Sequence, residues 1–290
     1  MPLDIFGTTF PNQNLGTGDE LALAIEQYTG EVEGTIARRA VLRPYVQMRT
    51  VRGTSSITND WIGKSSLQKV TPGTTPDQDD ETQFARNTLT VDTLILARRT
   101  LPLLDSFQTR YDVRTEIARE HGQEISKFWD QALFIQALKS AALATPAAGA
   151  VPGHSGGSTK TLASSGDATD PAALYAAFSD LMVQFENKDV DPVADGIVFA
   201  VKPATFYALL DAEQIVNGEY TTSDGNVVNG AKMLKAFGVP IVSSNNLPTT
   251  NITGHLLSNT RNSNAYDGDF SKTVALAFSP KAILAGETIP

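Results

Sequence analysis

The sequence predicts an α+β protein organised around one long helix. Two patterns carry this prediction. Between residues 111 and 144, apolar side chains recur three or four positions apart, as they do along one side of an amphipathic helix. After residue 169 the patterns indicate helix, strand, helix, hairpin, helix and then three strands. Such an order is typical of helices packed on a mixed sheet.

The composition excludes several classes of protein. The chain has 290 residues, of which 41% are hydrophobic, so it is long enough to bury a sizeable core. It has no cysteine, which excludes disulfides, thiol catalysis and zinc–thiolate sites. The net charge of −9 argues against direct nucleic-acid binding, which needs a basic face. We expect neither a signal peptide nor a membrane span, because no basic start leads into an apolar run and no apolar run is long enough to cross a bilayer.

The first forty residues divide into an arm and a helix. Residues 1–18 are rich in Gly, Pro, Asn and Thr without periodicity, and we expect a flexible arm there. Residues 19–40 carry apolar side chains on one face of a helix, with Asp19 as the expected N-cap. Pro44 follows the end of this helix.

Residues 45–99 predict a long hairpin. The stretches 45–63 and 81–99 are its expected strands, and turn-forming and acidic residues fill 64–80 between them. Few apolar side chains are available to stabilise it, and an isolated two-stranded hairpin is marginal in water. We therefore expect its apolar partner on a second copy of the chain. The residues expected to make this contact are Trp61, Ile62, Lys64, Leu67 and Val70.

The central helix is expected to span 111–144, which is about 45 Å at 1.5 Å per residue. Asp112 can cap its first turn, and the Ala-Thr-Pro sequence after Leu143 ends it. Charged residues such as Glu124, Lys127 and Asp130 fall outside the apolar stripe. The residues expected on the inner face are Val113, Ile117, Ile125, Phe128, Trp129, Ala132, Leu133, Ile135 and Leu138.

A second group of elements follows a linker. Residues 145–169 consist almost entirely of Ala, Gly, Pro, Ser and Thr, which predicts a flexible connection. Asp170 and Pro171 are the expected N-cap and first residue of the next helix. The elements expected from there on are helix 171–188, strand 196–201, helix 203–212, hairpin 219–228, helix 231–237 and strands 238–243, 255–257 and 273–278.

Two short motifs could indicate chemistry. Residues 153–157, Gly-His-Ser-Gly-Gly, match the nucleophile elbow of serine hydrolases, with Ser155 as nucleophile and His255 as base. The elbow needs a strand directly before the serine, and the preceding residues predict none, so we interpret the match as part of the linker. The acidic residues of 77–81 lack the glycine-turn spacing of a calcium loop and predict a solvated turn. We expect no catalytic residue, no metal and no cofactor.

Several stretches carry a resemblance to a known family. These are DELALA at 19–24, WIGK at 61–64, TPG at 71–73, YDVR at 111–114, VKP at 201–203 and FGVPIVS at 237–243. In this order and spacing they resemble the major capsid proteins of tailed bacteriophages, which have the Hong Kong 97-type fold. The resemblance is strongest to the short-tailed, T-seven-like podoviruses. It covers most of residues 19–285.

The resemblance implies a domain organisation. The implied parts are an N-terminal arm with the first helix (1–48), an extended loop hairpin (49–95), a peripheral domain with the spine helix (96–145), a linker with the axial domain (146–272), and a return strand toward the peripheral domain (273–290). Members of that family usually continue beyond the equivalent of Pro290. We therefore expect either that the chain continues or that its fold closes differently.

The resemblance also implies a function. It implies a non-enzymatic shell subunit that forms hexamers and pentamers in an icosahedral, T=7-type phage head around double-stranded DNA. Scaffolding protein and portal would be its partners during assembly in the host cytoplasm, and the virion its final location. Some relatives join their loops by a lysine–asparagine isopeptide bond. Lys64 and Lys69 lie in the corresponding loop, but no activating acid or partner asparagine is evident, so we expect noncovalent assembly.

Three alternatives remain open at this point. The first is the shell protein of a cellular nanocompartment (encapsulin) with the same fold. The second is a serine hydrolase that uses Ser155 and His255, against which the missing strand argues. The third is a minor decoration or adhesin protein, in which the long helix and the hairpin would have no evident purpose.

Overall fold

The computed structural model describes residues 32, 40–65, 67, 69–75, 83–98, 113–146, 149–210 and 234–287. The chain divides into two compact units, Met1–Ala40 with Ile95–Trp129, and Val41–Leu94 with Asp130–Pro290. Within the described ranges, no helix is both long and apolar enough to span a bilayer. The expected arm at 1–18, almost all of the expected helix at 19–40, the hairpin at 219–228 and the acidic turn at 77–81 lie outside the described residues.

The larger unit contains a four-stranded mixed sheet. Strand β4 pairs in parallel with β6 and antiparallel with β9, and β5 pairs antiparallel with β6, so the order is β5-β6-β4-β9. The bounds are Val198–Val201 for β4, Leu234–Ala236 for β5, Val239–Ser243 for β6 and Ala275–Phe278 for β9. All four residues of β4 are buried, as expected for a central strand with both faces covered.

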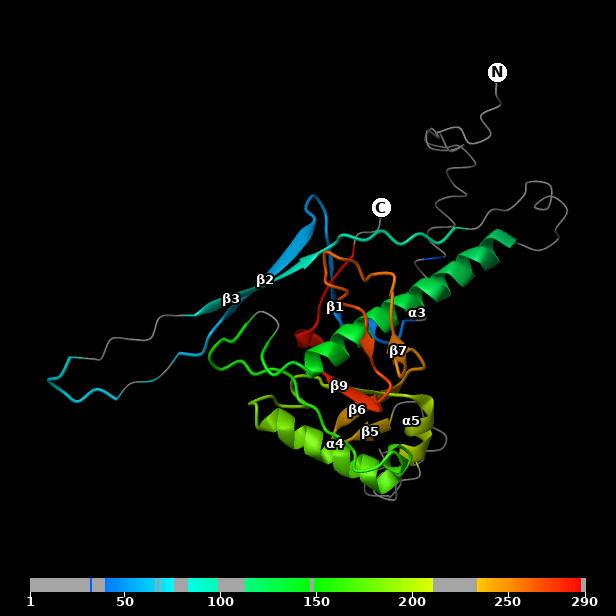
Figure 1. Cartoon of the computed structure of the whole chain (residues 1–290). Helices are drawn as coiled ribbons and strands as arrows, with labels where there is room; N and C mark the ends of the chain where they lie inside the picture. Colours follow the sequence, from blue (N-terminus) through cyan, green and yellow to red (C-terminus); the bar gives the residue numbers. More distant parts are fainter. Residues whose placement is uncertain are drawn as a thin grey trace. The chain divides into compact units, whose positions relative to one another are not determined.

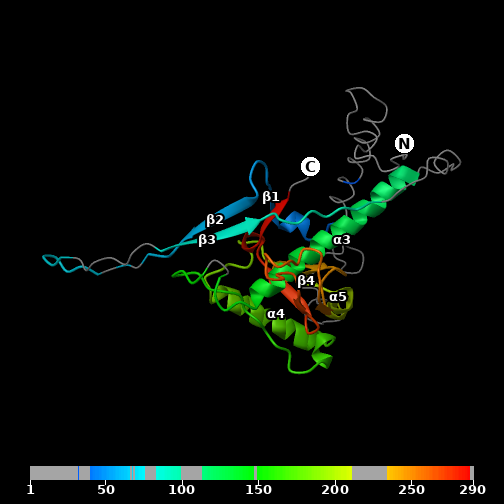
Figure 2. The ribbon, with the colours of Figure 1, turned by 45° about the horizontal axis from the view of Figure 1, so that its top comes forward.

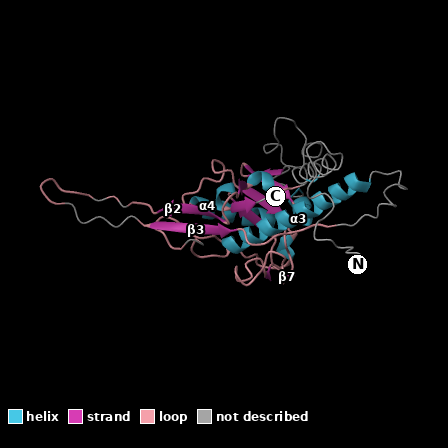
Figure 3. Ribbon diagram, turned by 90° about the horizontal axis from the view of Figure 1, so that it is seen from above, coloured by secondary structure: helices cyan, strands magenta, loops and turns pink. Residues whose placement is uncertain are grey.

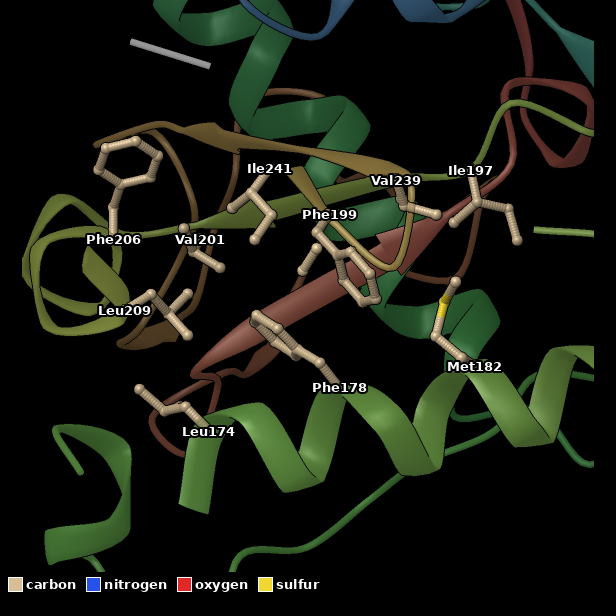
Figure 4. Packing of buried hydrophobic residues seen from close by; sticks show 11 residues of the cluster. Leu174, Phe178, Met182, Ile197, Phe199, Val201, Phe206, Leu209, Val239 and Ile241 are labelled. Carbon is tan, nitrogen blue, oxygen red and sulfur yellow. The ribbon is translucent and has the colours of Figure 1, made fainter. Parts of the chain in front are cut away.

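One face of this sheet is covered by two helices, α4 (Pro171–Glu186) and α5 (Pro203–Leu210). Phe178 of α4 stacks on Phe199 of β4, with ring centroids 4.6 Å apart. Figure 4 shows these rings with the surrounding aliphatic side chains. The predicted start of α4 is confirmed, because the Asp170 carboxylate accepts a hydrogen bond of 3.2 Å from the Ala172 amide and Pro171 is the first helical residue.

The opposite face of the sheet packs on the C-terminal part of helix α3 (Val113–Ala141). Val198 and Ala200 point to this side, whereas Phe199 and Val201 belong to the cluster under α4, which is the alternation that strand geometry requires. The sheet therefore lies between two layers of helix (Figure 1). The buried residues of the α3 cluster are Leu42, Val46, Leu133, Phe134, Ala137, Val198, Ala200, Leu247, Leu276, Phe278 and Ala285.

Helix α3 confirms the predicted long helix but corrects its inner face. Ile117, Ile125, Phe128 and Trp129 of the expected stripe are only half-buried. The most buried residues of this part of the helix are the small ones at every fourth position, Ala118, Gly122 and Ser126, followed by Asp130. Asp130, which falls outside the predicted apolar stripe, is nevertheless fully buried.

The predicted strand 45–63 is in fact two strands. Strand β1 (Gln47–Thr50) pairs in parallel with β10 (Leu284–Glu287) near the other end of the chain, and β2 (Ser56–Ile62) begins six residues later. The break contains Gly53, whose φ of +74° is a conformation that glycine adopts most easily. The hairpin therefore starts at Ser56 rather than at residue 45.

Two further expectations are corrected. Residues 234–236, expected in a helix, form strand β5, because Phe237 and Gly238 both have positive φ and make a tight turn into β6. Residues 255–257, expected as a strand, lie in a turn. The Asp267 carboxylate accepts hydrogen bonds from the Gly254 and His255 amides and closes a loop there.

The remaining described elements are short. They are strands β7 (Asn251–Ile252) and β8 (Gly268–Asp269), which pair with each other, strand β3 (Phe84–Thr90) of the hairpin, and 3-10 turns at Arg43–Tyr45, Gly166–Ala168 and Pro280–Ala282. The predicted helix at 203–212 and the strands at 196–201, 238–243 and 273–278 are confirmed as α5, β4, β6 and β9.

Candidate functional site

The structural feature that most needs a partner is the hairpin β2–β3. Its strands pair antiparallel from Ser56 opposite Thr90 to Ile62 opposite Phe84. Asp60 and Arg86 face each other across the pair and form two hydrogen bonds of 2.6 and 3.0 Å. This contact with Arg86 lowers the pKa of the Asp60 carboxyl. In Figures 1 and 2 the hairpin runs away from α4 and the sheet, and Figure 3 shows its two strands side by side.

Large apolar side chains are exposed at the far end of this hairpin. Leu67 is 99% exposed, Phe84 72%, Ile62 58% and Val70 47%. Exposed side chains of this size, gathered on one projecting element, indicate a surface that another molecule covers. Three of these four residues, Ile62, Leu67 and Val70, belong to the set expected to contact a second copy.

The inner end of the hairpin is fixed to the rest of the larger unit. The side chains of Ile57 and Leu89 lie over Gly286 of β10, where a Cβ atom would come within 2.7 Å of Ile57 Cδ1. Asn259 Nδ2 donates a hydrogen bond of 3.0 Å to the Asp92 carboxylate just after β3. The hairpin is therefore anchored at its base while its far end is exposed.

The other two predicted contact residues have partners within their own chain. The Trp61 ring lies 5.7 Å from the His154 ring, measured between centroids. The Lys64 ammonium forms a 2.9 Å ion pair with Asp189, in which both side chains are largely exposed. The structure therefore places Trp61 and Lys64 where the hairpin meets the segment 149–165, and Ile62, Leu67 and Val70 on its exposed part.

Sequence reasoning missed a buried polar contact at Asp130. Its carboxylate accepts hydrogen bonds from the backbone amides of Val41 (2.9 Å) and Leu42 (3.1 Å) and from Asn246 Nδ2 (3.1 Å). Burial raises the pKa of Asp130, and these hydrogen bonds oppose the rise. The only signal in the sequence was the four-residue spacing of Ala118, Gly122, Ser126 and Asp130, which places the acidic residue on the same side of the helix as three small ones.

The alternative hydrolase motif has no catalytic geometry. Ser155 is exposed in a segment that forms no strand at any described position from 149 to 165. His255 is stacked on Tyr266 with centroids 5.3 Å apart, and its Nδ1 accepts a hydrogen bond from the Leu257 amide. Burial lowers the pKa of His255. Among the residues that the structure describes, no group of three or more His, Cys, Asp or Glu side chains could hold a metal ion.

Comparison with known proteins identifies the family. Residues 69–284 match the family model described as "Gp10A-like: Major capsid protein", which is most of the chain. The chain belongs to this family of major capsid proteins. The predicted resemblance to the major capsid proteins of tailed phages is thus confirmed. The family is one of structural capsid proteins.

Solved capsid structures have the same fold as this Gp10A-like protein. The capsid protein of cyanophage P-SCSP1u aligns with a TM-score of 0.65 at 20% identity, over 95% of this chain and 78% of that one. The mature capsid of bacteriophage PhiM1 gives a TM-score of 0.67 at 21% identity, over 83% and 72% of the two chains. Mycobacterium phage Che8 gives 0.52 at 13% identity, over 73% and 71%. No curated protein matches the chain significantly by sequence.

Proposed function

We propose that this chain is the shell subunit of a tailed-phage head and assembles noncovalently into hexamers and pentamers around double-stranded DNA. The observation that carries the proposal is the hairpin β2–β3, which is anchored at its base and exposes large apolar side chains at its far end. Membership of a major capsid protein family supplies the class of assembly. An icosahedral, T=7-type shell of a podovirus is part of the same proposal.

The hairpin is proposed to lie on a second copy of the chain. A two-stranded hairpin with few apolar contacts of its own gains little stability from folding alone. Covering Ile62, Leu67, Val70 and the neighbouring Phe84 would remove a large apolar surface from water, at about 25 cal/mol per Å². Trp61 and Lys64 are proposed to belong to the same contact region.

The proposed domain organisation follows the Hong Kong 97-type fold. The hairpin lies in the extended loop (49–95), and α3 is the spine of the peripheral domain (96–145). Strands β5, β6 and β4 belong with α4 and α5 to the axial domain (146–272), and β9 (Ala275–Phe278) adds a strand from the last part (273–290) to the same sheet. Strand β10 in the last part (273–290) pairs with β1, which supports a return of the chain toward its N-terminal part.

The surroundings of the shell are proposed from the same family. Scaffolding protein and portal would act during assembly in the host cytoplasm, and the mature subunit would reside in the virion. The net charge of −9 supports enclosure of DNA without tight binding to it, because like charges repel. The alternative is the shell of a cellular nanocompartment (encapsulin), and the match to a major capsid protein family supports the phage head instead.

Electron microscopy of the purified chain, expressed with and without the scaffolding protein of its phage, tests the proposal. We expect capsomer rings or closed shells, with closed shells favoured by the scaffold. A small oligomer of fixed size in both preparations would contradict the shell function. A boiled denaturing gel should show only the 31.0 kDa band, since a ladder would contradict noncovalent assembly.

Two matched variants test the hairpin contact. Leu67→Asp places a charge on the exposed end of the hairpin and should abolish or strongly weaken shell formation without unfolding the chain. Leu256→Asp is the control, because Leu256 is also exposed (68%) but lies outside the hairpin. Equal assembly of Leu67→Asp and wild type would contradict the proposed contact.

A further inference from the structure

The segment 151–158 contacts three elements at once: the outer end of strand β2 at residues 61–64, the end of α3 and the end of α4. On one side it runs over the C-terminal end of α3. The Gly157 amide donates a 2.8 Å hydrogen bond to the Leu143 carbonyl. A Cβ atom on Gly156 would collide with the Leu143 carbonyl, and one on Gly157 with the Ala141 backbone. Only glycine allows this close approach.

The same segment is held by the end of α4. The Lys188 ammonium, two residues beyond α4, donates hydrogen bonds to the carbonyls of Gly156 (2.7 Å) and Gly157 (2.9 Å) and to the Ser158 hydroxyl. These three acceptors match the three protons of an ammonium group. The prediction of a flexible linker at 145–169 is therefore wrong for residues 151–158, which are fixed between two helix ends.

The other side of the segment contacts the hairpin. The Lys64 amide donates a 2.8 Å hydrogen bond to the Pro152 carbonyl. His154 Nε2 donates to the Ile62 carbonyl at 2.9 Å, and the His154 ring also lies beside the Trp61 ring. The Gly63 position leaves little room, since a Cβ atom there would lie 3.1 Å from Val151 Cγ1.

The two sides differ in strength. The contacts toward α3 and α4 are backbone to backbone, or involve a half-buried ammonium with three acceptors. Toward the hairpin, the Lys64 amide makes one backbone hydrogen bond to the Pro152 carbonyl, and the other polar contact is made by the exposed His154 ring, which as an exposed contact contributes little by itself.

We propose that residues 151–158 form a bracket that sets the direction of the hairpin, with His154 as its main positioning residue. The bracket fixes the hairpin relative to the ends of α3 and α4 before a second copy binds. Binding by an element that already points in the right direction loses less conformational entropy. This proposal rests on the proposed docking of the hairpin on a second copy. It assigns a structural role to residues 153–157, whose sequence resembles the nucleophile elbow of serine hydrolases.

A spin-label distance measurement on the unassembled chain tests the bracket. The chain has no cysteine, so the substitutions Thr74→Cys on the hairpin and Ala176→Cys on the exposed side of α4 give two unique labelling sites. We expect a narrow distance distribution in the parent chain and a clearly broader one after His154→Ala. Hydrogen exchange of the Lys64 amide, which donates to the Pro152 carbonyl, should accelerate about ten-fold or more, as for a segment released from its contacts.

Matched variants separate the bracket from general destabilisation. Lys281→Ala removes an exposed ion pair with Asp195, away from the bracket, and should leave the distance distribution unchanged. Gly157→Ala should broaden the distribution by displacing the segment from α3, whereas Gly166→Ala, whose Cβ would make only an ordinary 3.6 Å contact with the Ser164 hydroxyl, should not. The melting temperature of His154→Ala should stay close to that of the parent.

The outcomes decide the proposal. A broader distribution together with a several-fold slower formation of shells supports the bracket and its positioning role. An unchanged distribution in His154→Ala overturns the bracket. A broader distribution with an unchanged assembly rate overturns the positioning role. If the parent chain forms no shells, the proposed function fails, while the distance distribution still decides whether the bracket exists.

Discussion

The carboxylate of Asp130 accepts a hydrogen bond from the backbone amide of Leu42 at 3.1 Å, and both residues are buried. The same carboxylate accepts from the Val41 amide and from the Asn246 side chain. One buried side chain thus joins α3, the segment just before β1 and the loop after β6. A charged group is costly to bury, and these three donors are what compensates for it.

Removing this carboxylate should destabilise the chain. Asp130→Ala leaves the buried Leu42 amide without its acceptor, which should lower the free energy of unfolding by about 1–3 kcal/mol. Glu124→Ala on the same helix is the control, because it removes only an exposed i,i+3 pair with Lys127 and should cost about 0.2–0.5 kcal/mol. Urea unfolding of the unassembled chain measures both. Equal effects of the two substitutions would contradict a structural role for Asp130.

The pH dependence of stability should reveal the same residue. Burial raises the pKa of Asp130 above its ordinary value of 3.8. The folded chain then holds this proton more tightly than the unfolded chain. The stabilising contribution of Asp130 to the free energy of unfolding is therefore complete below pH 3.8 and is lost as the pH rises through the raised pKa. We expect the stability of wild type relative to Asp130→Asn to fall across this window in a series of urea titrations.

Asp267 should show the opposite sign. Hydrogen bonds from the Ser258 hydroxyl and from the Gly254 and His255 amides lower its pKa from 3.8 to about 2. The contribution of Asp267 to the free energy of unfolding is present above pH 3.8 and is lost as the pH falls toward 2. The melting temperature of Asp267→Asn should thus lie below that of wild type at pH 7, and the two should converge near pH 2.

A second variant checks the cause of this convergence. The Ser258 hydroxyl makes the largest contribution to the lowered pKa of Asp267. Ser258→Ala should therefore shift the acid-induced loss of stability to higher pH while keeping the carboxylate. An unchanged acid transition in Ser258→Ala would show that Asp267 is not its source.

Local patterns predicted the parts of the fold that local chemistry determines. Asp170 followed by Pro171 marks the start of α4, because a capping carboxylate and a fixed φ both favour the first helical turn. The continuous apolar run ending at Val201 marks the central strand β4. The order and spacing of the longer motifs predicted the family, and the match to the major capsid protein model confirms it.

Features that depend on distant parts of the chain could not be predicted in this way. Strand β1 pairs in parallel with β10, so that Gln47 lies opposite Leu284. Nothing in the sequence around either residue indicates this pairing or its register. Asp130 was placed only outside the apolar stripe, and its burial could not be predicted because its donors, among them the Leu42 amide, are far away in sequence. Likewise, Gly156 and Gly157 are typical of a flexible linker, although in the structure they allow close contact with the end of α3.

Shortening the hairpin should separate folding from assembly. Ile62 pairs with Phe84, and the Gly63 amide donates a 2.8 Å hydrogen bond to the Gln83 carbonyl, so replacing residues 64–82 by Asn-Gly would close the two strands with a two-residue turn. None of the described residues of the deleted segment (64, 65, 67 and 69–75) belongs to the main core clusters. We therefore expect a folded chain with a melting temperature within a few degrees of wild type that forms no shells.

A variant of unchanged length identifies what the deletion removed. Leu67→Ser with Val70→Ser keeps the reach of the hairpin but removes exposed apolar side chains. If apolar contact drives docking, this double variant should assemble only at higher protein concentration, as seen by light scattering and electron microscopy. Shell formation by the shortened chain at the wild-type concentration would contradict the hairpin's role, since no residue of 64–82 would then be needed between copies.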